Sequence, residues 1–284
     1  MGNLLARAFL FFSCFLLSFF CAGKIKVGPV LMDLVMEQDG VVAGKEFWIG
    51  WHIIRDSGWH TYWQHPGDVG VPPSIDWDVP KGFSVGPLLY CSPEKVKMGT
   101  IRANGNYGET LFLFKVKCSD NVQVGETFVM EGKASWLTCS RQCLPGFTDL
   151  SIEFEVVDRS SFDSVWHPRF EEFRNSIPEK IGEEWQLSAT EQNGFITLHM
   201  QGKAKNDFAR SDRPVFYSYD RIVRSNGNQF FTQKDDLLAL RLQRSKWSVK
   251  DDGFLSGLIY RKQGWGKGSS SPYSEIRVPI KKIK

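Results

Sequence analysis

Most of the chain alternates apolar and polar residues over short stretches, which is the pattern of β-strands. In residues 24–158 such stretches include Phe47–Ile53 and Leu111–Val116. Turn residues separate them at short intervals, as in Asp39-Gly40 and Asn104-Gly105. Short strands with turn signals at this spacing are typical of a β-sandwich. No helix of useful length is predicted in this part of the chain.

The pattern changes after the first predicted sandwich. Phe170, Phe173 and Ile177 recur at helical spacing, so residues 159–181 are predicted to form a short helical linker. Alternation returns in residues 182–284, which indicates a second β-sandwich. The predicted fold class is therefore all-β, with two β-sandwiches joined by a short helical linker.

The first 23 residues have the features of a signal peptide. Arg7 and the amino terminus give a positive start, and an almost wholly apolar stretch follows. That stretch, about 15 residues long, is shorter than the roughly 20 residues that span a bilayer as a helix. We therefore expect cleavage after Gly23 and export to the periplasm. The alternative is a lipid anchor on Cys21, which the bulky Phe20 before it disfavours.

Charge does not single out a class of partner. The sequence has 35 basic and 32 acidic side chains, and the signal peptide takes away only Arg7. A nucleic-acid surface needs clustered basic residues in large excess, so no nucleic-acid partner is expected. No phosphate-binding loop, paired carboxylates or serine–histidine–acid arrangement has a convincing context. We therefore expect no cofactor and no resident metal.

Four cysteines remain in the exported chain, namely Cys91, Cys118, Cys139 and Cys143. Export places them where disulfides persist, but sequence alone leaves three ways to pair them. Residues four apart on one strand lie about 13 Å apart, whereas bridged Cα atoms lie roughly 4.4–6.8 Å apart. A bridge between Cys139 and Cys143 therefore requires a turn. A three-residue hairpin loop, Ser140–Gln142, would place them opposite each other on neighbouring strands.

Three interpretations of this close pair stay open from its spacing. A disulfide at the end of a sandwich near solvent exchanges readily, and Arg141 in the loop would favour a thiolate. A structural staple is the second interpretation, although so small a loop gives little stabilisation. Two thiolates with His60 or His65 would suit copper(I) or zinc. The aromatic residues around these histidines are predicted to anchor a sandwich core and its following turn, and Met98 is interpreted as a core or edge residue.

Several motifs, arriving in order, resemble one known family. They are Gly58–Trp63, Pro66–Asp68, Trp77, Pro80–Gly82, Asn106–Glu109, Trp136–Cys139 and Cys143–Pro145. Residues 30–157, which contain them, resemble the amino-terminal periplasmic domain of the thiol:disulfide interchange protein DsbD. The likeness is to the branch near the suppressor-of-copper-sensitivity membrane reductase. A weaker likeness to the second periplasmic domain of that branch covers residues 185–260.

The resemblance implies an immunoglobulin-like sandwich that takes up electrons at its cysteine pair and passes them to periplasmic thioredoxin-like proteins. By position, Cys143 matches the family cysteine that forms the mixed disulfide with partners, and Cys139 matches its resolving companion. The other residues expected at the site match the family's covering loop or flank the pair: Asn106, Tyr107, Gly108, Glu109, Trp136, Arg141 and Pro145. The best-known family member has a phenylalanine in the covering loop where this chain has Asn106.

The source of electrons is expected to lie outside this chain. Family proteins continue into a membrane electron carrier, whereas this sequence ends at Lys284, so a separately encoded membrane electron carrier is expected. The associated processes would be cytochrome c assembly or copper tolerance. The alternative function is a non-catalytic partner-binding or copper-handling protein. The second sandwich lacks cysteine and has His199 as its one histidine, so we expect it to do no chemistry.

Overall fold

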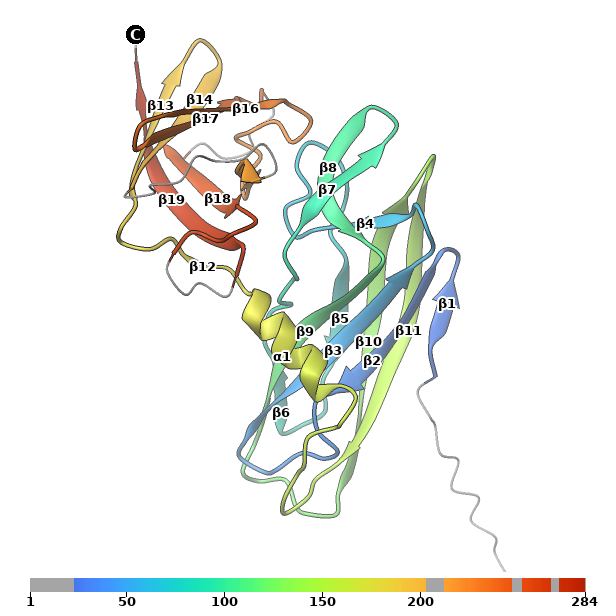
Figure 1. Ribbon diagram of the computed structural model, residues 1–284. Helices are drawn as coiled ribbons and strands as arrows, with labels where there is room; N and C mark the ends of the chain where they lie inside the picture. The colour runs from blue at the N-terminus through green and yellow to red at the C-terminus, as the bar shows by residue number, and fades with distance from the viewer. Residues whose placement is uncertain (1–22, 203–211, 247–251, 267–270, 284) are drawn as a thin grey trace, which may run out of the picture.

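The computed structural model describes residues 23–202, 212–246, 252–266 and 271–283. The predicted signal peptide, apart from Gly23, therefore lies outside the described residues. The described chain consists mainly of strands with a single helix, so the predicted all-β fold class is confirmed (Figure 1). No helix in these ranges is long and apolar enough to cross a membrane.

Strands β1–β11 form two sheets that share one core. The five-stranded sheet has the order β1-β2-β3-β9-β6. Its strands are β1 (Ile25–Val27), β2 (Val30–Met36), β3 (Glu46–Arg55), β9 (Glu109–Cys118) and β6 (Phe83–Val85). The six-stranded sheet has the order β11-β10-β4-β8-β7, with β5 also paired to β10. Its strands are β11 (Cys143–Glu155), β10 (Thr127–Cys139), β4 (His60–Tyr62), β8 (Ile101–Tyr107), β7 (Glu94–Met98) and β5 (Ser74–Asp78).

Strand β10 shows how the alternation divides its residues between the two faces of the sheet. Met130, Ala134 and Trp136 are buried in the core between the sheets. Because successive side chains of a strand point to opposite faces, Leu137 and Cys139 lie on the outer face. The Trp136 ring covers Gly146 of β11, where an added Cβ would lie 2.2 Å from the indole. Glycine is therefore the residue that lets this tryptophan pack flat across the hairpin.

The single helix, α1 (His167–Ser176), covers the outer face of the five-stranded sheet (Figure 1). Phe170 and Phe173 are buried there against Val35, Leu111 and Leu113. Consecutive apolar residues in β9 are explained by this contact, because the sheet is covered on both faces. The helix therefore packs on the five-stranded sheet as part of the same unit as strands β1–β11.

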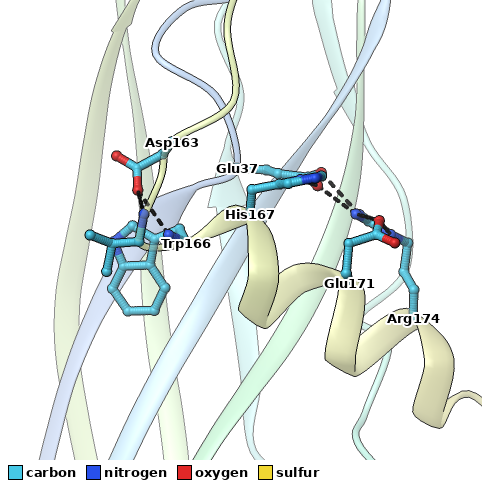
Figure 2. Close-up of polar contacts among 7 residues, drawn as sticks. Glu37, Asp163, Trp166, His167, Glu171 and Arg174 are labelled. Carbon is cyan, nitrogen blue, oxygen red and sulfur yellow. Dashed lines mark hydrogen bonds and ion pairs between the residues drawn. The ribbon is translucent and has the colours of Figure 1, made fainter.

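An ion-pair network holds α1 in place (Figure 2). The buried Glu37 carboxylate accepts hydrogen bonds from His167 Nδ1 at 2.7 Å and from an Arg174 Nη at 2.9 Å. Arg174 also pairs with Glu171 one turn earlier on the helix. Burial by itself raises the pKa of Glu37, but the hydrogen bonds from Arg174 and His167 outweigh it and hold that pKa below its usual value.

Strands β12–β19 form an eight-stranded sheet with the order β15-β18-β19-β13-β14-β17-β16, in which β12 also pairs with β19. The strands are β12 (Glu179–Lys180), β13 (Gln186–Gln192), β14 (Phe195–Gln201), β15 (Val215–Ser218), β16 (Gln229–Lys234), β17 (Leu237–Gln243), β18 (Phe254–Tyr260) and β19 (Tyr273–Lys282). The long β19 joins its two halves, pairing with β18 and, at its end, with β13. The sheet thereby curls around its own core, which includes Leu198, Leu240 and Leu255.

The carboxy-terminal sheet lies beside β7 and β8 at one end of the first two sheets (Figure 1). Trp63 is buried here against Tyr217 and Leu258 of the carboxy-terminal sheet. The aromatic residues here are expected to anchor a sandwich core and its following turn, and Trp63 lies after β4, outside the core that the first two sheets share. Strand β4 ends at Tyr62, so Trp63 no longer follows the alternation of the strand. Its indole packs between the first two sheets and the carboxy-terminal sheet.

The Glu37 network predicts a pH-dependent attachment of α1. Because the folded-state pKa of Glu37 is lowered, its contribution to stability is present above the ordinary carboxyl value of 4.5 and is lost as pH falls through the lowered pKa. We expect Glu37→Gln to lower the free energy of unfolding by about 1–3 kcal/mol at neutral pH. We also expect the variant to lose less stability than the parent between neutral pH and acid. Urea unfolding at several pH values measures both, and parallel pH profiles would contradict the assignment.

Candidate functional site: the disulfide at the β10–β11 hairpin

The cysteine pair closes the hairpin between β10 and β11. The two strands pair along their whole length, and their last pair is Cys139 opposite Cys143. These residues are joined by a disulfide with Cα atoms 4.1 Å apart. Ser140 N–H donates to the Gln142 carbonyl at 3.0 Å and closes the three-residue loop. The predicted hairpin is therefore confirmed.

Four strands place side chains in one row on the outer face of the six-stranded sheet. Cys143 pairs with Cys139, Cys139 with His60 of β4, and His60 with Tyr107 of β8. Directly paired residues point to the same face, so His60 and Tyr107 lie on the same face as the disulfide and beside it. Cys139 is fully buried, whereas Cys143 is half-buried. The two sulfurs are thus unequally accessible, and Cys143 is the one that an incoming thiol reaches more easily.

Among the described residues, each sulfur has one close polar or sulfur-containing side chain from another strand. The Tyr62 hydroxyl donates to Cys139 Sγ at 3.2 Å, while Met98 Sδ lies 3.4 Å from Cys143 Sγ. Burial raises the pKa of Tyr62, so its hydroxyl keeps the proton that it donates. In the reduced protein the same hydroxyl is placed to donate to a thiolate at Cys139, which favours the charged form.

His60 lies beside the pair as a neutral aromatic side chain. It is 1% exposed, and its ring meets Tyr62 and Tyr107 edge-on, each with centroids 5.4 Å away. Burial, together with the positive charge of Arg55, lowers the pKa of His60 to about 4. The ring is therefore uncharged at neutral pH and does not stabilise a thiolate by its charge.

Of the expected covering loop, the structure brings Tyr107 to the disulfide. Tyr107 packs against the cysteines, whereas Asn106 points to the other face of β8 and donates to the Ser92 carbonyl at 2.9 Å. Glu109 lies at the start of β9 and pairs with His52 and Arg169.

Gly108 is the turn between β8 and β9 and has a positive φ of 59°. Its carbonyl accepts hydrogen bonds from the backbone and side chain of Arg55. It therefore shapes the loop beside the disulfide through its backbone and brings no side chain to it.

The expected flanking residues take different positions around the hairpin. Trp136 lies in the core, on the face opposite the cysteines. Pro145 shares the outer face with Cys143 and is exposed. Arg141 is exposed in the hairpin loop, and no hydrogen bond or ion pair among the described residues joins it to either sulfur.

The remaining cysteines are free thiols of low reactivity. Cys91 lines a cavity of about 630 Å³ between β8, β9 and α1, and burial raises the pKa of its thiol to about 12. Burial also raises the pKa of Cys118. Because the thiolate is the nucleophile, both are poor exchange groups next to the bridged pair.

One cluster in the described part of the chain has the spacing of metal ligands, and it does not fit a cation. It consists of Glu37, His167 and Glu171. The Arg174 guanidinium already pairs with both carboxylates, so a metal ion there would meet a fixed positive charge (Figure 2). His65, considered as a ligand from the sequence, stacks near Tyr219 of the carboxy-terminal part with ring centroids 4.7 Å apart.

Comparison with known proteins agrees with the geometry of this site. Residues 32–154 match the family model described as thiol:disulfide interchange protein DsbD, N-terminal. They contain the whole hairpin around the disulfide, which makes this part of the chain a thiol:disulfide interchange domain.

A solved structure extends the likeness beyond the DsbD segment. The N-terminal periplasmic domain of ScsB from Proteus mirabilis superimposes with a TM-score of 0.67 at 19% identity. The match covers 92% of this chain and 98% of that one, so the overall fold is shared. A protein of unknown function from Porphyromonas gingivalis W83 matches with a TM-score of only 0.24 at 10% identity, over 89% of this chain and 100% of that one. No curated protein matches the sequence.

Sequence reasoning missed two neighbours of the disulfide, Tyr62 and Met98. Tyr62 lies 77 residues before Cys139, and Met98 lies 45 residues before Cys143. A partial signal was present for Tyr62, because alternation places it on the same face as His60. Nothing local connects β4 and the β7–β8 hairpin with β10, since that neighbourhood depends on the order of strands in the sheet.

The Tyr62 hydrogen bond predicts a change in thiol acidity. We expect Tyr62→Phe to raise the apparent pKa of the reduced cysteine pair, because the thiolate loses a donor while the ring stays in place. Thiolate absorbance in the ultraviolet, followed against pH in the reduced protein, measures it. Tyr90→Phe is the matched control, since that hydroxyl bonds the Pro73 carbonyl in the same half of the molecule. Equal titration of both variants and the parent would show that Tyr62 does not act on the sulfur.

Proposed function

We propose that this protein is a periplasmic thiol–disulfide exchange module that passes electrons between a membrane reductase and thioredoxin-like proteins. The observation that carries the proposal is a hairpin disulfide with one enclosed sulfur, Cys139, and one partly accessible sulfur, Cys143. A structural staple has no need of this difference. The matched family and the periplasmic domain of ScsB support the compartment and the class of partner.

The proposed reaction is a pair of thiol–disulfide displacements. In the reduced protein the Cys143 thiolate attacks a disulfide of the partner, forms a mixed disulfide and releases one partner thiolate, which takes up a proton. The Cys139 thiolate then attacks the Cys143 sulfur and displaces the second partner thiolate. Two electrons leave this protein, which ends with the Cys139–Cys143 bridge, and the partner ends as a dithiol. A membrane electron carrier restores the dithiol by the reverse displacements.

The partner surface is proposed to include the exposed edge beside Cys143. Strand β11 stands at the edge of its sheet, and Cys143, Pro145 and Phe147 share its outer face. Phe147 is 70% exposed, which is high for so large an apolar side chain. An aromatic anchor next to a reactive sulfur is a suitable contact for a protein that must bring its own cysteine to the same place.

The alternative function is copper handling, and the position of Met98 favours it as the second candidate. Two thiolates and a thioether are soft donors that suit copper(I). In that function, reduced protein would retain stoichiometric copper(I) against a chelator and lose it after joint Cys139→Ser and Cys143→Ser replacement. In the exchange function, the reduced protein gives its copper up to the chelator.

The proposed order of attack predicts which single-cysteine variant traps a partner. We expect Cys139→Ala to accumulate a mixed disulfide through Cys143 with an oxidised thioredoxin-like protein, because this chain then has no second thiol to complete the exchange. We expect Cys143→Ala to trap far less, because the remaining sulfur is fully buried. Non-reducing electrophoresis and mass spectrometry identify the adducts. Equal trapping by both variants would contradict the assigned roles, and trapping by neither would contradict exchange itself.

The proposed contact at Phe147 predicts different effects on the rate of exchange with a protein and with a small thiol. We expect Phe147→Ser to slow exchange with a thioredoxin-like protein by about tenfold, the equivalent of losing one good apolar contact. Reduction by glutathione should stay at the parent rate, because the disulfide itself is unchanged. Phe230→Ser, at a side chain 52% exposed on β16, is the matched control. A loss seen equally with both thiols would place the effect in the disulfide and not in docking.

A further inference from the structure

The β7–β8 hairpin lies between the disulfide and the carboxy-terminal sheet, and its two faces serve different contacts. Val96 and Ala103 are paired across the hairpin and pack, with Met98, against the cysteine cluster. Alternation turns Lys95 and Arg102 to the opposite face. That face meets the carboxy-terminal part of the chain.

In the described part of the chain, the outer half of the β7–β8 hairpin is not paired with any further strand of its sheet. Strand β4 pairs with β8 only from Gly105 to Tyr107. The segment from Ile101 to Ala103 has β7 as its ladder partner, and β7 is the last strand of the sheet, whereas Asn104 still bonds through its backbone to Trp63 and Pro66. A two-stranded hairpin is marginally stable by itself, so the position of its tip depends on side-chain contacts. Met98, the residue against Cys143, is in the last ladder pair before this tip.

A loop of the carboxy-terminal sheet grips the hairpin through Arg102. The Arg102 side chain donates to the Asn226 carbonyl at 2.9 Å and to Asn228 Oδ1 at 2.8 Å. Its backbone N–H donates to Asn226 Oδ1 at 3.0 Å, and its carbonyl accepts from Ser225 Oγ at 3.1 Å. Four hydrogen bonds therefore join this one residue of β8 to residues 225–228.

The base of the hairpin has further contacts with the same sheet. Lys95 Nζ lies 4.7 Å from the centre of the Tyr217 ring, and the Tyr273 hydroxyl donates to the Pro93 carbonyl at 2.7 Å. Asp68, in the loop after β4, accepts from Asn226 N–H at 3.2 Å and donates its own N–H to Ser225 Oγ at 2.9 Å. The loop at residues 225–228 is thereby fixed to both β8 and the Pro66–Asp68 turn.

We propose that the carboxy-terminal sheet is a clamp that holds the β7–β8 hairpin over Cys143, with Arg102 as the gripping residue and Met98 as the shield. The proposal rests on the proposed exchange function and gives its regulation. A partner that breaks the hydrogen bonds between residues 225–228 and Arg102 frees the hairpin tip. Met98 then moves away, and Cys143 Sγ becomes accessible to the partner. The carboxy-terminal sheet then does no chemistry and still sets the rate of exchange. Met98 and Arg102 are positioning residues in this scheme.

The test is the rate of reduction of the Cys139–Cys143 disulfide by glutathione in the full exported chain. We expect Arg102→Ala to raise the second-order rate constant by about tenfold, because the hairpin tip then opens more often. Met98→Ala should raise it by a similar factor, and Met98→Leu should keep the parent rate, since the shield acts by its bulk. Arg277→Ala is the control, because it removes exposed polar contacts of the same sheet far from the hairpin in sequence.

The double variant decides whether the two residues act through one element. If the clamp works by holding Met98, Arg102→Ala adds nothing in a Met98→Ala background. Additive effects, or a parent rate for Arg102→Ala in a protein with unchanged circular dichroism, would overturn the clamp. A disulfide that neither glutathione nor a thioredoxin-like protein reduces in any of these variants would instead overturn the proposed function. A pair that is reduced at one common rate in all variants would overturn the clamp alone.

Discussion

The pairing register of β10 with β11 is the constraint on which the site depends. The hairpin loop of three residues sets Cys139 opposite Cys143, and the same register sets Trp136 opposite Gly146. Because side chains alternate with a period of two, a slip by one residue would turn the cysteines into the core and the tryptophan into solvent. The fit of the Trp136 ring over Gly146 therefore stabilises the face on which the disulfide lies. Packing in the core and chemistry on the surface are two consequences of one register.

A polar interior lies under the disulfide, on the other side of the same strands. The buried Arg55 donates to Thr61, Thr110 and the Gly108 carbonyl. Burial lowers its pKa to about 10, and its charge helps to keep His60 neutral. The outer face is thereby left with aromatic and sulfur-containing neighbours, which enclose Cys139 without offering it a fixed charge. Asn106 and Glu109 belong to this interior and to the docking of α1, so the likeness of the covering loop to its family does not extend to every side chain in it.

The carboxy-terminal sheet and the first two sheets meet through specific contacts and not through a bare linker. Trp63 is buried between them, and Arg102 forms hydrogen bonds with Asn226 and Asn228 of the carboxy-terminal part. The helix α1 is likewise packed through Phe170 onto the first body of strands, so a fragment ending near Arg159 would expose the apolar surface that the helix covers. The chemistry is confined to one part of the molecule, while the shape around it depends on the other.

The sequence by itself determined the all-β class, the hairpin and the closeness of its two cysteines, because alternation and loop length are local properties of the chain. Motifs that resemble the amino-terminal domain of DsbD added the expectation of thiol–disulfide exchange. Only the tertiary structure decided which residues surround the sulfurs. Tyr62 and Met98 reach them because the sheet order β10-β4-β8-β7 does not follow the chain. Trp63 lies outside the core of the first two sheets because β4 ends before it, and Asn106 points away from the pair because neighbouring residues of β8 face opposite sides. Strand order follows from the packing of distant segments, and a pattern read along one strand contains no record of its neighbours.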